Sequence, residues 1–228
     1  MADFDPEELM GEWVFSHLVY PPKSLESELE VYLDHIETHS HTIKNIRRER
    51  DKLSHTLREA SVKARESLDE WAQRDWSQYD LIGFSTMFQQ NMASLALAAR
   101  IKNYYPGIPV VFGGANCEGT MGRELMRQFP FIDYVCIGEG ERAFGNFLDK
   151  IRSGEPMPTC GILNQGDELL IAPQQPKSTA MGSCPLDFDD WIRSVQHHFP
   201  DQLQYTYWPL EASRGCCWGR SLNANFAV

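Results

Sequence analysis

Apolar residues are spaced differently in the first and second parts of the chain. Through residue 78 they recur every three or four positions, which is typical of amphipathic helices. Pro21-Pro22 ends the first expected helix, and Ser24 is a cap for the second. From His41 to Trp76 a narrow apolar stripe runs through a strongly charged sequence, which predicts one or two surface helices. Residues 1–78 are therefore expected to form a helical N-terminal region.

A second pattern begins at Tyr79, where short apolar runs alternate with helical segments. The expected strands are 80–85, 109–112 and 133–137, followed by helices at 90–104, 120–129 and 142–151. Successive strand–loop–helix units predict right-handed crossovers and a parallel sheet. Residues 160–163 and 169–172 are expected to form a terminal hairpin. The fold class predicted for residues 79–172 is α/β.

The remaining residues, 173–228, begin with a segment rich in Pro, Ser and Gly that is typical of a linker. A short helix is expected to start within Leu186 to Trp191. The chain then reaches a cysteine pair, Cys216-Cys217.

The charge and hydrophobicity of the chain argue against several classes of binding partner. The net charge of -11 argues against sequence-independent binding to nucleic acid or to an anionic membrane. No apolar run approaches the roughly 20 residues that span a bilayer. The acidic N-terminus lacks the basic and apolar regions of a signal peptide. We therefore expect a soluble, cytoplasmic protein with no nucleic-acid or membrane partner.

The six cysteines do not have the spacing of a zinc site, because no C-x-x-C pair occurs. Four of them lie far apart in the sequence and are expected to be reduced, buried, apolar side chains: Cys117, Cys136, Cys160 and Cys184.

Loops that follow the three expected strands lie where open α/β sheets bind ligands. The first, residues 85–91, is rich in amides, and the second contains Gly113-Gly114, which lets backbone approach a flat ligand closely. The third, residues 138–141, begins the pattern Gly138-x-Gly140-x-x-Ala143, which matches a relaxed dinucleotide fingerprint, but its two glutamates would repel a pyrophosphate. Tight turns alone remain an alternative explanation of these glycines.

The segments GFSTMFQQN, VVFGGANCEGTMGRELM and IGEGERAF resemble the cobalamin-binding domain of cobalamin-dependent radical S-adenosylmethionine (SAM) proteins. Gly11-Glu12-Trp13 and LDFDDW resemble the branch linked to maturation of ribosomally made peptide natural products. The resemblance implies a flavodoxin/Rossmann-like parallel sheet with a corrin ring over the three loops. The residues that it places against the corrin are Ser85, Thr86, Phe88, Gln89, Gln90, Gly113, Gly114, Asn116, Gly138, Glu139, Gly140 and Glu141.

Two features qualify what the resemblance implies for the sheet and the cobalt. The chain has no D-x-H-x-x-G motif, so a lower-axial histidine is not expected. Family domains usually begin with a strand–helix–strand segment, whereas only ten residues precede Gly11 here. We expect the opening strands to be missing, which leaves unpaired backbone at the sheet edge. Reduced stability, or self-association through that edge, is the expected consequence.

The segment LEASRGCCWG resembles the start of a radical SAM cluster motif, which the family completes with a C-x-F-C unit. Three thiolates hold a four-iron cluster in this chemistry, and SAM binds the fourth iron. Cys216 is the remaining metal-ligand candidate, because Ala224 and Ala227 occupy the other two positions. We expect a truncated chain, inactive alone and without catalytic residues, whose full-length parent holds the 4Fe-4S cluster and SAM. A frameshift would account for the two alanines.

The function predicted from the sequence is the cobalamin-binding portion of a cobalamin-dependent radical SAM enzyme that acts on a peptide precursor, for example by methylation. One alternative is a non-catalytic cobalamin-binding sensor or interaction module. Another is a flavodoxin-like domain for a different flat cofactor. The expected division is a helical region at 1–78, a cobalamin-binding domain at 79–172, and a linker with the start of a radical SAM domain at 173–228.

Overall fold

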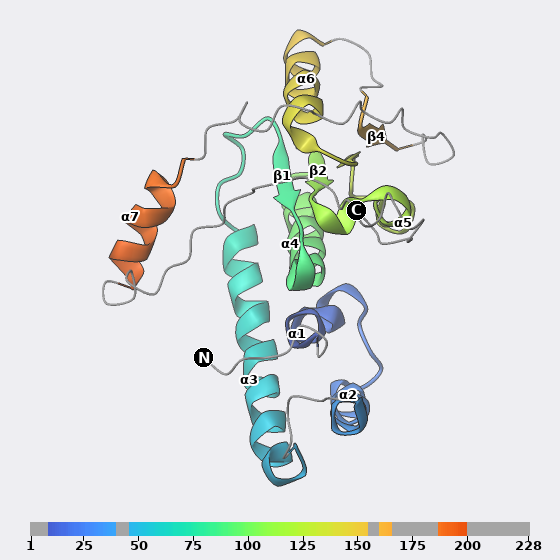
Figure 1. Cartoon of the computed structure of the whole chain (residues 1–228), viewed down its shortest axis with the longest axis vertical. Helices are drawn as coiled ribbons and strands as arrows, with labels where there is room; N and C mark the ends of the chain where they lie inside the picture. Colours follow the sequence, from blue (N-terminus) through green and yellow to red (C-terminus); the bar gives the residue numbers. More distant parts are fainter. Residues whose placement is uncertain (1–8, 40–45, 155–159, 166–186, 200–228) are drawn as a thin grey trace, which may run out of the picture. The chain divides into compact units, whose positions relative to one another are not determined.

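A computed structural model describes residues 9–39, 46–154, 160–165 and 187–199. The chain divides into two compact units, Met1–Pro176 and Lys177–Val228 (Figure 1). The first unit contains six helices and a sheet among its described residues, and the second contains helix α7 (Asp189–His198). The predicted strand at 169–172 and the cysteine motif at 216–227 lie outside the described residues.

Three helices precede the sheet: α1 (Met10–Val19), α2 (Leu25–His39) and α3 (Ile46–Ala72). The predicted boundary between the first two is confirmed, since Pro21-Pro22 follows α1 directly. The hydroxyl of Ser24 accepts a hydrogen bond from the backbone N–H of Ser27 at 3.3 Å and so caps α2. The charged segment forms one continuous helix over its described residues.

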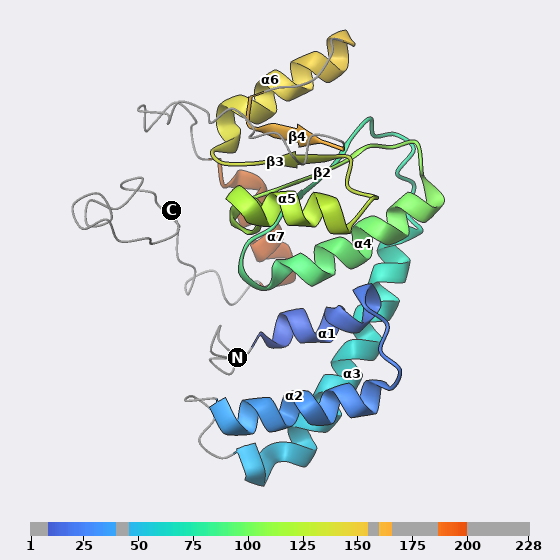
Figure 2. The same ribbon diagram turned by 90° about the vertical axis from the view of Figure 1, so that its right-hand side faces the viewer.

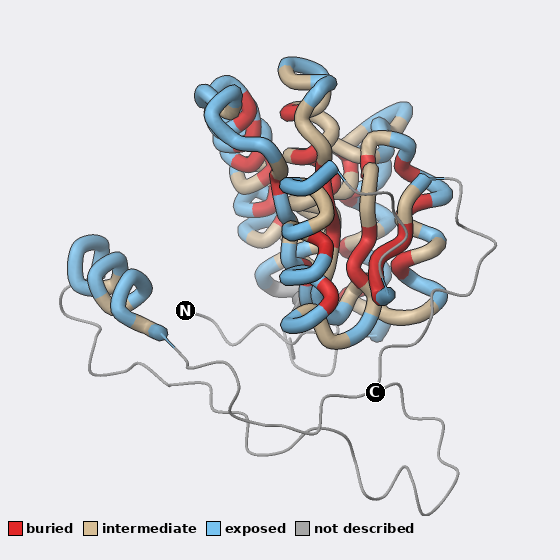
Figure 3. Tube along the Cα trace, turned by 90° about the horizontal axis from the view of Figure 1, so that it is seen from above, coloured by how far each residue is buried: buried red, intermediate tan, exposed pale blue. Residues whose placement is uncertain are grey.

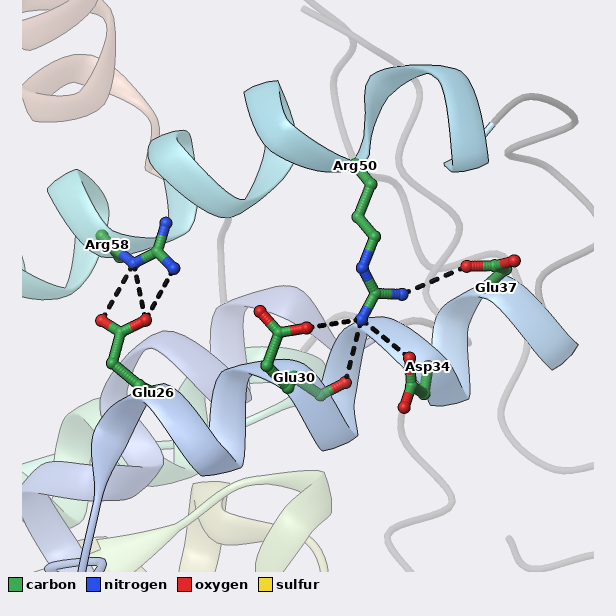
Figure 4. A network of polar contacts seen from close by, with 6 residues as sticks. All are labelled: Glu26, Glu30, Asp34, Glu37, Arg50 and Arg58. Atoms are coloured by element: carbon green, nitrogen blue, oxygen red, sulfur yellow. Dashed lines mark hydrogen bonds and ion pairs between the residues drawn. The ribbon is translucent and has the colours of Figure 1, made fainter.

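Helices α2 and α3 pack through an apolar cluster that contains Leu29, Leu33 and Leu57. Ion pairs flank this cluster, and Figure 4 shows two arginines of α3 reaching carboxylates of α2. Arg50 lies 2.8 Å from Glu30, 2.7 Å from Asp34 and 3.1 Å from Glu37, and Arg58 lies 2.6 Å from Glu26. Exposed pairs of this kind each contribute at most about 1 kcal/mol, so the apolar cluster holds the two helices together and the charges align them.

The sheet has the order β1 (Ile82–Ser85), β2 (Val110–Gly113), β3 (Tyr134–Cys136) and β4 (Ile162–Asn164). The first three strands are parallel, and β4 pairs with β3 in the antiparallel direction. The helices between and after the parallel strands are α4 (Asn91–Tyr104), α5 (Gly119–Gln128) and α6 (Gly140–Ser153). The predicted fold class, a mainly parallel α/β sheet of the flavodoxin or Rossmann type, is confirmed.

Helices cover the two faces of the sheet unequally. Figure 2 shows α4 and α5 on one face, α6 on the other, and α1 against α4 on the side away from the sheet. The larger core lies between the sheet and α4 and α5, and includes Phe112, Leu95 and Met126. A smaller core under α6 includes Cys136 and Phe147. Figure 3 shows these buried positions on the facing sides of the helices and strands.

Strand β1 lies at the edge of the sheet and, among the described residues, pairs with β2 alone. The backbone N–H groups of Ile82 and Thr86 donate to β2 and its flanking residues, so those of Gly83 and Ser85 point away from β2. Both Gly83 and Ser85 are exposed. The apolar run at β1 therefore does not form a fully buried strand, and among the described residues its outer side is an unpaired sheet edge.

Asp133 fixes the register at the amino ends of β2 and β3. Its Oδ2 accepts a hydrogen bond of 2.7 Å from the backbone N–H of Val110 and pairs with the ammonium of Lys102 at 2.7 Å. The carboxyl ends of β1, β2 and β3 then lie together at the opposite edge of the sheet. Within the described residues, no helix is long and apolar enough to cross a bilayer.

Candidate ligand-binding edge

The loops at residues 85–91, 113–116 and 138–141 follow the carboxyl ends of β1, β2 and β3, and we call them the ligand edge. Because these strands are parallel neighbours in one sheet, their loops meet at the same edge. The structure therefore brings together all twelve residues that the resemblance assigns to the corrin. Cys216, the candidate metal ligand, lies outside the described residues.

The first two loops pack directly on each other at Gly114. Its φ is +90°, and a Cβ added there would lie 2.4 Å from the carbonyl oxygen of Thr86, so only glycine fits. The N–H of Thr86 donates to Gly113 at 2.8 Å, and the N–H of Asn116 donates to Thr86 at 3.1 Å. These contacts join the two loops into one rigid surface of backbone.

Thr86 supports this surface from below. It is fully buried, and its hydroxyl lies 3.3 Å from the carbonyl oxygen of Gly113 and 3.8 Å from the sulfur of Cys117. Its side chain therefore holds the loops together, whereas the neighbouring Ser85 is exposed at the edge.

Phe88 projects from the first loop with 78% of its surface exposed. Its φ of 48° is in the left-handed region, where a residue other than glycine pays a strain of about 1–3 kcal/mol. The side-chain amide of Asn116 donates a hydrogen bond of 3.1 Å to the carbonyl of Phe88. Backbone strain in a loop at a ligand edge is typical of a residue held in place for binding.

Two glutamines complete the first loop, and each uses its side-chain oxygen within the protein. The Oε1 of Gln90 accepts from the backbone N–H of Met87 at 3.0 Å. The Oε1 of Gln89 accepts from the backbone N–H of Gly11 at 2.7 Å. Each side chain can therefore donate hydrogen bonds to a ligand through its amide nitrogen.

The third loop is built differently, from a left-handed glycine and a helix start. Gly138 has a φ of +81°, and no atom lies within 4 Å of the position where a Cβ would stand. Glu139 precedes the first residue of α6, so the N-terminal N–H groups of α6 lie at the ligand edge. Glu141 lies in the first turn, where a carboxylate interacts favourably with the helix dipole.

Cys117 and Cys136 lie next to the ligand edge as protonated thiols. Burial raises the pKa of Cys117 to about 11, and burial with nearby Glu118 and Glu141 raises the pKa of Cys136. The prediction of buried cysteines is confirmed for these two and wrong for Cys160, which is exposed because it lies in the turn before β4. Cys184 lies outside the described residues.

Sequence reasoning did not assign a role to Gly11 and Glu12, which contact the first loop from α1. The two oxygens of Glu12 accept hydrogen bonds of 2.8 Å each from the backbone N–H groups of Asn91 and Met92. In the sequence, the need for this contact is indicated by Gln90, which precedes α4 and is not a residue type that caps helices. The start of α4 therefore requires a hydrogen-bond acceptor from another part of the chain. A carboxylate from elsewhere in the chain fulfils that requirement.

A groove of about 440 Å³ lies beside the ligand edge, between α1, the start of α4, and α5. It shares Phe88 and Asn116 with the candidate site. Its lining is mixed apolar and polar and comprises Glu12, Tyr20, Phe88, Asn91, Met92, Asn116, Met121, Glu124, Leu125, Gln128 and Phe129.

The ligand edge fits a flat ring with amides around its rim. Gly114 and Gly138 present exposed backbone, Phe88 presents an exposed aromatic ring, and Gln90 presents an amide. Amide donors and acceptors match such a rim, and bare backbone allows close approach to a flat face. The fold and this edge define the class of the molecule as a parallel α/β ligand-binding domain.

The family model of the B12 binding domain matches residues 32–148, which is just over half of the 228 residues. The chain therefore belongs to the B12 binding domain family and is a cobalamin-binding protein. The match begins within α2 and ends within α6, so it includes all three loops of the ligand edge. No curated protein and no solved structure matches the chain.

Proposed function

We propose that the chain binds cobalamin at the ligand edge, as the cobalamin-binding part of a cobalamin-dependent radical SAM enzyme that modifies a peptide precursor. The observation that carries the first half is the joint position of the three loops within the matched family domain. The resemblance of LEASRGCCWG and LDFDDW to that enzyme branch supports the second half. The charge of the chain and its buried thiols favour a cytoplasmic location.

Each part of the ligand edge has a distinct role in this proposal. Gly113, Gly114 and Gly138 let the corrin approach the backbone, and Phe88 contacts its apolar surface. Polar groups then bind the amides around the rim: Ser85, Gln89, Gln90, Asn116, Glu139 and Glu141. Thr86 fixes the first two loops, and Gly140 begins α6. When bound, cobalamin supplies the cobalt that carries and transfers a methyl group.

Titration with hydroxocobalamin, followed by visible absorption, tests the proposal. We expect a shift to a base-off spectrum without histidine ligation, because the chain has no D-x-H-x-x-G motif. Parallel titration with flavin mononucleotide distinguishes cobalamin from another flat cofactor. Flavin binding without a cobalamin spectrum would favour the flavodoxin-like alternative.

The proposed radical SAM chemistry depends on thiolates that the chain does not supply. Cys216 is the proposed first ligand, while Ala224 and Ala227 have no donor atoms. Anaerobic reconstitution with iron and sulfide is expected to give no cluster absorption in this chain. The double variant Ala224→Cys with Ala227→Cys restores C-x-F-C and is expected to gain it. A stable cluster in the unchanged chain would contradict this assignment.

We also propose self-association through the exposed edge of β1. The outward backbone groups of Gly83 and Ser85 support it, because an unpaired strand edge can add a second strand. Gly83→Pro removes an outward donor and leaves the bonds to β2 intact. Light scattering is expected to report a dimer for the unchanged chain and a monomer for this variant. A monomeric unchanged chain would exclude the interface.

A further inference from the structure

We propose that α1 positions the first loop of the ligand edge for cobalamin, with Gly11 and Glu12 as its positioning residues. The inference rests on the proposed cobalamin site and deepens it, since neither residue belongs to the predicted contact set. It makes the helical N-terminal region part of the binding machinery.

Glu12 replaces the missing cap of α4. The first N–H groups of a helix have no partner within the helix, and those of Asn91 and Met92 both donate to the Glu12 carboxylate at 2.8 Å. Gln90, the residue before α4, makes no capping hydrogen bond with its side chain. The direction in which α4 leaves the loop therefore depends on a carboxylate held by α1.

Gly11 fixes the residue next to the strained position. Its N–H donates to Gln89 at 2.7 Å, and a Cβ at Gly11 would lie 3.0 Å from the Oε1 and 3.1 Å from the Cβ of Gln89. The contact is thus close enough that a larger residue would displace Gln89. The backbone of Gln89 is itself kinked, with φ of -88° and ψ of 38°, inside the short 3-10 helix η2 (Phe88–Gln90) that precedes α4.

The strain at Phe88 explains why such positioning is needed. A left-handed, exposed phenylalanine persists only where its surroundings hold it. Asn116 holds its carbonyl from the second loop, and Gly11 holds the next residue from α1. Removing the α1 contacts lets the loop relax, so that the aromatic ring leaves its position at the ligand edge.

Helix α1 is itself anchored outside the sheet. It packs against both α3 and α4, and Trp13 stacks on Tyr32 of α2 with ring centroids 5.1 Å apart. His17, on the same helix, is buried. The position of the first loop therefore depends on how α1 packs against the other helices of the N-terminal region.

Hydroxocobalamin titration of Glu12→Ala, Glu12→Gln and Gly11→Ala tests the inference. We expect about a tenfold or greater loss of affinity for Glu12→Ala, corresponding to one lost charge-assisted hydrogen-bond pair. Glu12→Gln is expected to lose less, because its amide oxygen still accepts one N–H. Gly11→Ala is expected to weaken binding by displacing Gln89.

Two controls separate positioning from general destabilisation. Ile132→Ala destabilises the larger core before the amino end of β3, opposite the ligand edge, and Glu66→Ala removes an exposed carboxylate from α3. Both are expected to keep the affinity of the unchanged chain, even where the melting temperature falls. Equal affinity of Glu12→Ala and the unchanged chain, or an equal loss in Ile132→Ala, would overturn the inference.

Hydrogen exchange gives a readout that does not depend on cobalamin. The amides of Asn91 and Met92 are expected to exchange faster in Glu12→Ala than in the unchanged chain, while those of α6 stay the same. If the unchanged chain fails to bind cobalamin, the proposed function fails, and this exchange pattern still decides the positioning role. Unchanged exchange at both amides would refute that role by itself.

Discussion

Close tertiary contacts fix the first two loops of the ligand edge, whereas the need for glycine at Gly138 in the third loop comes from its backbone conformation. Gly114 is pressed against Thr86, and Gln89 is bound by Gly11 across 78 residues of sequence. No atom lies within 4 Å of the corresponding position at Gly138, where a positive φ alone requires glycine. Glycine therefore serves two different purposes at one edge: at Gly114 it allows close packing, and at Gly138 it allows the positive φ that turns the chain.

The largest expected effect is that of Gly114→Ala. The new Cβ would collide with the Thr86 carbonyl at 2.4 Å, in addition to the strain of a positive φ. We expect a loss of stability of roughly 3 kcal/mol or more and no measurable cobalamin binding. Thermal unfolding and visible titration measure the two effects, and a variant with normal stability would refute the close packing.

Phe88→Gly is expected to separate stability from binding. Glycine adopts a φ of 48° without strain, and relief of the roughly 1–3 kcal/mol of strain offsets the greater entropy that glycine gives the unfolded chain. The melting temperature should therefore hold or rise. Loss of the exposed ring should weaken cobalamin binding by about tenfold. If affinity is unchanged, the ring has no role in the site.

Gly138→Ala is expected to destabilise the protein less than Gly114→Ala. The space around the new methyl group is open, and the cost is that of a left-handed alanine, about 1–2 kcal/mol. Its loss of stability should therefore be clearly smaller than that of Gly114→Ala in the same unfolding assay. Equal losses would show that both glycines are needed for the same reason.

Low pH is expected to destabilise α1 and, with it, the first two loops that α1 contacts. This is the smallest of the expected effects. Burial, together with Arg65 and Arg100, lowers the pKa of His17 below its ordinary value. The unfolded chain then binds the proton more readily, so stability is complete above a pH of about 6.5 and falls as the pH drops toward the folded pKa.

The melting temperature of the unchanged chain at pH 7.5 and 5.5, compared with that of His17→Gln, measures this effect. The variant has no titrating side chain at this position, so its melting temperature should fall less between the two values. The same decrease in both proteins would exclude His17 as the cause.

Local patterns were sufficient to predict most elements. A few neighbouring residues are enough to recognise each apolar run at β1, β2 and β3. The same is true of the proline pair after α1. The predicted meeting of the loops also required no side-chain geometry, because consecutive parallel strands bring their carboxyl ends to one edge. Gly114 and Gly138 could be predicted as part of the site for the same reason, because both lie in loops at that edge.

Other features depend on residues distant in sequence. Glu12 caps a helix that begins 79 residues later, and no sequence pattern around position 12 or 91 predicts that contact. Exposure of Cys160 and of the outer side of β1 likewise depends on which elements cover them.

The class of fold, the family resemblance and the loops of the ligand edge could therefore be predicted from the residues alone, because periodicity and glycine positions act locally. The contact of α1 with that edge and the strained conformation of Phe88 become evident only once the helices and loops are packed together. The physical reason is that strain and capping are satisfied by whichever group packing brings near, regardless of its distance along the chain.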